Sequence, residues 1–127
     1  MIQTILVFIG GGIGAALRHG VNVGAARVLG VAFPWGTLIV NVVGSLAMGL
    51  LAAWFAFRTD MGLTQHARLF LTTGILGGFT TFSAFSLDVA LLWERNAVGQ
   101  AAAYVAASVI LSVACLFAGM AVVRAVS

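Results

Sequence analysis

The sequence predicts an all-α membrane protein with four transmembrane helices, the third of them broken near its middle. Of its 127 residues, 62% are hydrophobic and only 7% are charged. A soluble domain carries about 25% charged residues, so the composition excludes a solvated globular surface. Long uncharged runs alternate with short polar stretches, and a glycine pair followed by two threonines interrupts the third run.

Four apolar runs are long enough to span a bilayer, whose hydrocarbon core takes about 20 helical residues. Gly30, Pro34 and Trp35 mark the first connection and the next helix start, and polar residues mark the other two. The first run lacks the basic segment of a secretory signal and is expected to be a retained span. We expect one transmembrane domain, residues 1–127, with spans at approximately 3–27, 35–57, 69–93 and 101–123.

The arginines give these spans almost no preferred orientation. An excess of arginine normally marks the cytoplasmic side. One side carries Arg58, Arg68 and Arg124, and the other carries Arg27 and Arg95, plus Arg18 if a residue within the first span counts. This balance favours an antiparallel dual-topology homodimer, and a fixed topology set by other features is the alternative. Scattered arginines are also unlike the dense basic patch of a nucleic-acid interface.

Polar side chains form a stripe on each of two spans. Residues four apart share a helix face, and such trios occur in the second span (Thr37, Asn41, Ser45) and in the fourth (Tyr104, Ser108, Ser112). Facing stripes would line a narrow polar track. The alternative is that the hydroxyls bond to carbonyls of their own helix, although an Asn amide is harder to satisfy in this way.

The third span carries the most informative segment, residues 77–86 with the sequence GGFTTFSAFS. A helix break here would expose carbonyls near Gly77 and Thr80, which suit a small cation, and amides and hydroxyls at residues 81–83, which suit an anion. Phe82 and Phe85 share a face, and their ring edges carry partial positive charge. A continuous packing helix softened by glycine is the alternative, with both phenylalanines facing lipid or neighbouring helices.

The remaining polar residues indicate neither catalysis nor a side-chain metal site. No nucleophile and base are paired, so we expect no enzyme, and His19 and His66 have no partners at ligand spacing. The single cysteine, Cys115, excludes an intrachain disulfide. Asp88 in the third span is expected to form a structural ion pair, with Arg18 as one candidate partner.

Three segments together resemble the bacterial fluoride-channel family, the Fluc proteins also called CrcB. They are GGIGAALR at residues 11–18, TLIVNVVGS at residues 37–45 and GGFTTFSAFS at residues 77–86. The length and the plan of four spans agree along the whole chain. Ala84 stands where the family usually has Thr, which removes one hydroxyl, and His19 stands where an aromatic residue often follows the arginine.

This resemblance implies an antiparallel dimer with two fluoride pathways and a central structural sodium ion (Na+). Backbone carbonyls of Gly77 and Thr80 would hold the sodium, and Arg18 would lie near a vestibule. The pathway residues it implies are Asn41, Phe82, Phe85, Thr81, Ser83, Tyr104, Ser108 and Ser112. The implied function is passive export of fluoride by a multi-pass protein of the bacterial inner membrane, whose other partners are a second copy and the lipid bilayer.

Two other classes of membrane protein are less consistent with these residues. A small proton-coupled drug exporter needs a membrane-embedded carboxylate, usually early in the chain. The first span has none, and Asp88 is the only acidic residue within any predicted span. A noncatalytic assembly subunit or a holin would account for the glycines but not for Asn41 together with the Thr-Thr-Phe-Ser segment.

Overall fold

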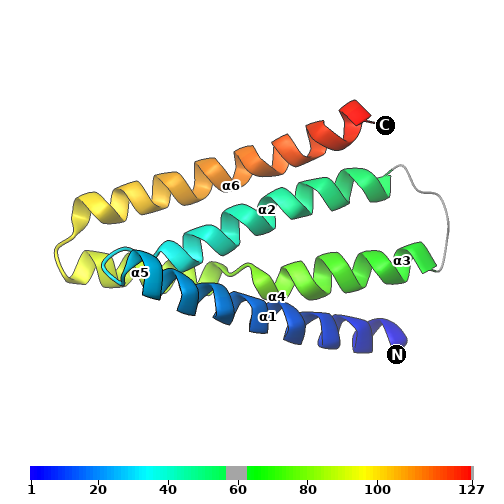
Figure 1. Ribbon diagram of the computed structural model, residues 1–127, viewed down its shortest axis with the longest axis horizontal. Helices are drawn as coiled ribbons and strands as arrows, with labels where there is room; N and C mark the ends of the chain where they lie inside the picture. The colour runs from blue at the N-terminus through cyan, green and yellow to red at the C-terminus, as the bar shows by residue number, and fades with distance from the viewer. Residues whose placement is uncertain (57–62, 127) are drawn as a thin grey trace.

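The computed structural model describes residues 1–56 and 63–126, and every regular element in these ranges is a helix (Figure 1). The elements are α1 (Ile2–Leu29), α2 (Trp35–Ala56), α3 (Leu63–Arg68), the π-helical segment η1 (Leu69–Leu76), α4 (Gly77–Phe79), α5 (Phe82–Glu94) and α6 (Val98–Val126). Residue 57 of the predicted second span and Arg58 lie outside the described residues.

Four helices are long and apolar enough to cross a membrane, which confirms the predicted number: Ile2–Leu29, Trp35–Ala56, Thr64–Glu94 and Val98–Val126. Gly30, with a φ of 85°, caps the end of α1, and Asn96, with a φ of 64°, lies in the turn after α5. Glycine and asparagine tolerate this left-handed region best. The third helix already begins at Leu63, so half of the polar connection expected before residue 69 is helical.

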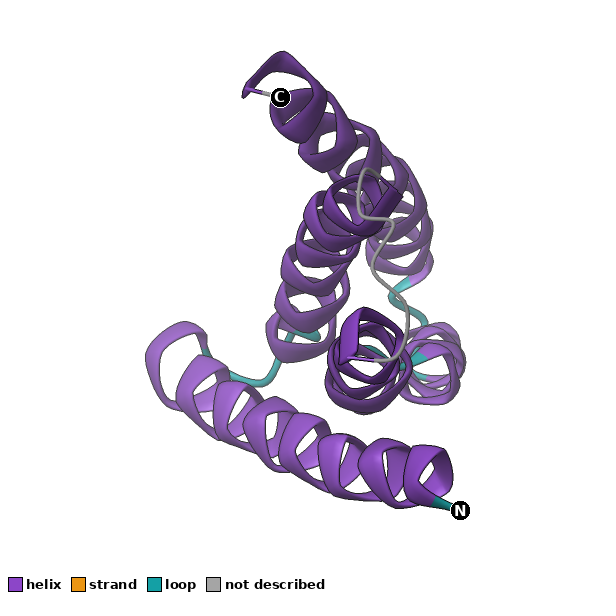
Figure 2. Cartoon of the chain, turned by 90° about the vertical axis from the view of Figure 1, so that its right-hand side faces the viewer, coloured by secondary structure: helices purple, strands orange, loops and turns teal. Residues whose placement is uncertain are grey.

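The two chain termini lie at the same end of the bundle as α3, and the α1–α2 loop and α5–α6 turn lie at the other end (Figure 1). Viewed from one end, α2 and α6 form a pair above the rod built by α3, η1, α4 and α5, and α1 lies below (Figure 2). The main packing is of α6 along α2, and of α1 along η1 and α4.

Glycines allow both pairs of helices to approach closely. A Cβ atom on Gly10 would lie 2.7 Å from the Phe70 carbonyl oxygen, and one on Gly14 would overlap the Ile75 carbonyl. Close backbone contact supplies packing energy in lipid, which offers no hydrophobic force between helices. Gly20 and Gly24 of α1 differ, because nothing in the described part of the chain lies within 4 Å of a Cβ added at either position.

The third membrane helix is interrupted near its middle, as predicted. Thr80 and Thr81 are extended, with ψ angles of 157° and 122°, between the end of α4 and the start of α5. The Thr81 hydroxyl accepts a hydrogen bond from the Ala84 amide at 3.1 Å and so caps the N-terminus of α5. The interruption faces α2 and α6, which carry the predicted polar stripes.

Candidate functional site

Asn41 on α2 bridges the helix break through its side-chain amide. Its Nδ2 atom donates to the Thr81 carbonyl oxygen at 3.1 Å, and the Thr81 amide donates to its Oδ1 atom at 2.8 Å. Both backbone groups of the extended residue are therefore satisfied by one side chain, as nonhelical backbone at this depth requires. The sequence signal was the Asn itself, whose amide a single helix rarely satisfies.

The break redirects two backbone amides away from the carbonyls they would reach in a continuous helix. An α-helix pairs each amide with the carbonyl four residues before it. The Thr81 amide, which would pair with Gly77, donates to Asn41, and the Ala84 amide, which would pair with Thr80, donates to the Thr81 hydroxyl. Gly77 and Thr80 carry the two carbonyls that were predicted to suit a cation.

A cavity of about 290 Å³, here called the track cavity, opens beside the break. It is walled by α2, the break, α5 and α6, and its lining residues are Asn41, Ser45, Thr80, Thr81, Phe82, Phe85, Ser108, Val109, Ser112 and Val113. Six of the eight predicted pathway residues therefore meet in one cavity. Its wall contains amide, hydroxyl and aromatic groups but no charged side chain.

The hydroxyls of Ser108 and Ser112 are the unusual feature of this wall. Both oxygens are buried, and neither has a hydrogen-bond partner in the described chain. Bonding to carbonyls of their own helix, the alternative raised for these serines, is therefore absent from this structure. An unsatisfied buried polar group costs about 1–3 kcal/mol, so these oxygens are suited to meet a ligand or water.

The two phenylalanines occupy different environments. Phe85 is buried and Phe82 is 78% exposed, while their ring centroids are 5.5 Å apart with planes tilted by 45°. Phe85 also contacts the ring of Tyr104, with centroids 5.1 Å apart. Phe82 thus forms the outer part of the cavity wall, and Phe85 forms the inner part.

Tyr104 and Ser83 do not line the track cavity. Tyr104 is fully buried, and its hydroxyl donates to the Asp88 Oδ2 atom at 3.0 Å. The ion pair expected for Asp88, with Arg18 as one candidate partner, is absent from the described residues, and the carboxylate accepts a hydrogen bond from the Tyr104 phenol instead. The exposed Ser83 has its hydroxyl oxygen 3.3 Å from that of Thr81.

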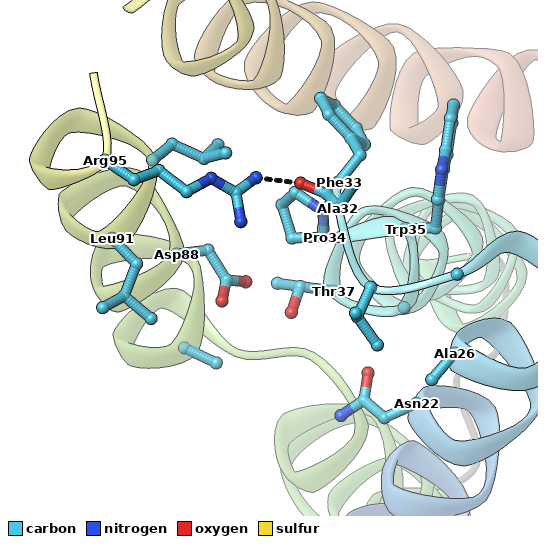
Figure 3. A pocket seen from close by; sticks show the side chains of 15 residues that line it. Asn22, Ala26, Ala32, Phe33, Pro34, Trp35, Thr37, Asp88, Leu91 and Arg95 are labelled. Atoms are coloured by element: carbon cyan, nitrogen blue, oxygen red, sulfur yellow. Dashed lines mark hydrogen bonds between the residues drawn. The ribbon is translucent and has the colours of Figure 1, made fainter. Parts of the chain in front are cut away.

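A second cavity, of about 330 Å³ and here called the loop cavity, lies at the end of the bundle that carries the α1–α2 loop (Figure 3). Asn22 from α1, Thr37 from α2, and Asp88 and Arg95 from α5 and its end supply its polar wall. No local pattern predicted this cavity, because only folding brings residues 30–37 beside residues 84–95. Arg18, expected near a vestibule, is half-buried and lines neither cavity.

These features define a class: a small multi-pass membrane protein with a helix broken at mid-membrane and a cavity of neutral donors at the break. The chain belongs to the CrcB family, since residues 5–120 match the family model described as CrcB-like protein, Camphor Resistance (CrcB).

Curated relatives match over nearly their whole length. The chain is 61% identical to the fluoride-specific ion channel FluC of Rhodopseudomonas palustris (strain BisB5), over 97% of this chain and 98% of the relative. It is 60% identical to the fluoride-specific ion channel FluC of Methylobacterium nodulans, over 98% of both chains. The chain is therefore a multi-pass protein of the bacterial inner membrane from a family of channels and not of enzymes.

Proposed function

We propose that this protein is a passive fluoride channel that lets cytoplasmic fluoride leave the cell. The observation that carries the proposal is the track cavity, in which neutral hydrogen-bond donors surround a break in a membrane helix. The names of the relatives point to fluoride as the ion. Fluoride is small and strongly hydrated, so a selective path must replace its water with donors at close range.

The hydrogen-bond donors of the track cavity suit a conducted anion, which must bind in the cavity and then leave it. One N–H of the Asn41 amide is engaged by the Thr81 carbonyl, and its second N–H is left for an ion. The unpartnered hydroxyls of Ser108 and Ser112 lie on the facing helix. Ring edges of Phe82 and Phe85 add partial positive charge. None of these groups carries a full charge that would trap the anion.

We further propose that two copies associate as an antiparallel dimer with two such pathways. Arg27 and Arg95 lie at one end of the bundle, and Arg68 and Arg124 lie at the other, which supports insertion in both orientations. The exposed ring of Phe82 supports a neighbour at the open side of the track cavity. A second copy would complete that wall.

The Gly77 and Thr80 carbonyls fit a structural sodium ion between the two copies. Both have lost their helical amide partners to Asn41 and Thr81, which leaves oxygen ligands of the kind that hard cations prefer. Hard cations take roughly six oxygens, so two carbonyls from one chain require further ligands, such as the same pair from a partner. Bound sodium would neutralise converging carbonyl dipoles and hold the dimer together.

The decisive experiment measures fluoride efflux from proteoliposomes with a fluoride electrode. The purified protein should release fluoride rapidly when a potassium ionophore balances the charge, while chloride and a cationic drug should remain trapped. Efflux no faster than from protein-free liposomes would refute the function, and drug movement coupled to a proton gradient would favour the exporter class instead.

The sodium site has a separate test. Protein purified in sodium-free buffer should melt at a lower temperature and dissociate more readily than protein kept in sodium. Identical melting and dissociation in sodium and in N-methylglucamine would contradict the proposed site and leave the channel function standing.

A further inference from the structure

The loop cavity contains a cation that the proposed pathway does not use. Arg95 follows α5, and its guanidinium group donates a hydrogen bond to the Ala32 carbonyl of the α1–α2 loop (Figure 3). This bond places the positive charge across the opening between the loop and the α5–α6 turn. A guanidinium group has five N–H donors, so donors remain for an anion at the mouth of the cavity.

Arg95 shares the cavity with one negative group, Asp88. Asp88 precedes Arg95 by seven residues and lies about two turns of α5 further into the bundle. The Asp88 carboxylate accepts from Tyr104, and the described chain shows no ion pair between it and Arg95. These are the two charged residues of the cavity wall. Without Arg95, the wall would therefore carry only a negative charge.

One buried side chain, Tyr104, packs against the walls of both the loop cavity and the track cavity. Tyr104 contacts Phe33 of the loop cavity, with ring centroids 5.5 Å apart, and Phe85 of the track cavity, with centroids 5.1 Å apart. The loop cavity is therefore connected to the wall of the track cavity by a chain of three aromatic rings, Phe33, Tyr104 and Phe85.

We propose that the loop cavity is the access chamber at this end of the pathway, and that Arg95 concentrates fluoride in its mouth. The inference rests on the proposed channel function and goes beyond it, because it assigns anion recruitment to Arg95, which lines the chamber, and not to Arg18. Arg95 acts through its charge and is not a site where the ion stays bound.

The size of the effect follows from the electrostatics of a single charge. In water, a unit charge attracts a monovalent anion about 7 Å away by roughly the thermal energy, which corresponds to an about threefold enrichment. The screening length is about 30 Å at 0.01 M salt and about 3 Å at 1 M. The enrichment should therefore be present at low ionic strength and lost at high ionic strength.

The test compares initial fluoride efflux at millimolar fluoride from neutral phosphatidylcholine liposomes, in low or molar concentrations of an impermeant salt. Arg95→Gln removes the charge and keeps an amide that can bond to Ala32, while Arg95→Lys keeps the charge. Arg124→Gln is the matched control, because it removes an arginine at the other end of the bundle that lines neither cavity. Gel filtration and melting would establish that each variant is folded.

We expect Arg95→Gln to conduct about threefold more slowly than wild type at low salt and equally fast at molar salt. Arg95→Lys and Arg124→Gln should match wild type in both. Equal rates for Arg95→Gln and wild type at low salt would overturn the proposal. A slower efflux that persists at molar salt, or that Arg95→Lys also shows, would overturn the proposal. Arg95 would then have a structural role, in which its hydrogen bond to Ala32 holds the α1–α2 loop in place.

Wild-type protein provides a second test that needs no variant. Its own efflux at millimolar fluoride should fall about threefold between low and molar salt as the charge is screened. A salt-independent wild-type rate would overturn the role of Arg95 while leaving the channel function intact. Absence of any wild-type efflux would instead refute the channel function itself.

Discussion

Replacing Asn41 by Asp tests the junction between the helix break and the proposed pathway. The change keeps the side-chain shape but replaces the Nδ2 donor by an acceptor oxygen. The Thr81 amide can still donate to the remaining oxygen, as it does at 2.8 Å in the wild type. The Thr81 carbonyl, now 3.1 Å from a donor, would face an oxygen that repels it.

The perturbation acts on both stability and conduction. Leaving one part-buried carbonyl unsatisfied costs about 1–3 kcal/mol, so the break should loosen while the four helices persist. For the ion, a carboxylate about 4 Å away repels fluoride by roughly 4 kcal/mol at an effective dielectric constant near 20. Since each 1.4 kcal/mol is about a factor of ten in rate, efflux should fall by about a thousandfold, to the background of empty liposomes.

The assay is fluoride-electrode recording of efflux, with gel filtration and thermal melting on the same samples. Asn96→Asp is the matched control, because it makes the same chemical change in the α5–α6 turn, outside both cavities. We expect a folded Asn41→Asp protein that does not conduct and an Asn96→Asp protein that does. Unchanged efflux through Asn41→Asp would refute the assignment of this amide to the pathway.

Three further predictions concern other parts of the bundle. Phe82→Ile and Phe85→Ile should each slow fluoride efflux without changing the gel-filtration profile, because they remove ring edges and keep apolar bulk. Normal efflux in both variants would mean that the two phenylalanines have only a packing role. Ser112→Ala should not lower the melting temperature, since its buried hydroxyl has no partner to lose among the described residues. The same change should slow efflux about tenfold if that donor replaces water at the ion; unaltered efflux would exclude this role. Gly14→Ala should destabilise the protein by about 1–3 kcal/mol in chemical denaturation, because the added methyl overlaps the Ile75 carbonyl. Gly99→Ala should not, because its added methyl contacts no described residue. Equal stability of Gly14→Ala and wild type would contradict the close packing of α1.

Much of the site was predictable because the signals of its residues lie within single helices. Asn41 stands out in an apolar span, and two glycines followed by two threonines indicate a break through their residue types alone. The four-residue spacing of Ser108 and Ser112 places both on one face. These signals are local, so sequence periodicity and residue chemistry were sufficient to read them.

Other features depend on segments that meet only after folding. The partner of Asp88 was expected to be a cation. Its carboxylate instead accepts a hydrogen bond from the hydroxyl of Tyr104, which lies sixteen residues later on α6. The loop cavity joins residues of α1, α2, α5 and two connections, and no local pattern marks it. The π-helical turns of Leu69–Leu76, which pack against the glycines of α1, were not predicted either, because the apolar run that contains them is equally typical of an α-helix.

The sequence by itself determined that the protein lies in a membrane, that it has four spans and where the third span is broken. Hydropathy and helix-breaking residues act on the chain segment that contains them, so these features are local. The tertiary structure alone decided how the break is completed. The Asn41 amide, forty residues away, takes the Thr81 amide that a continuous helix would give to Gly77. Hydrogen bonds between distant segments depend on how the helices pack against one another. The sequence therefore shows where a helix stops, but it does not show which group satisfies the backbone at that point.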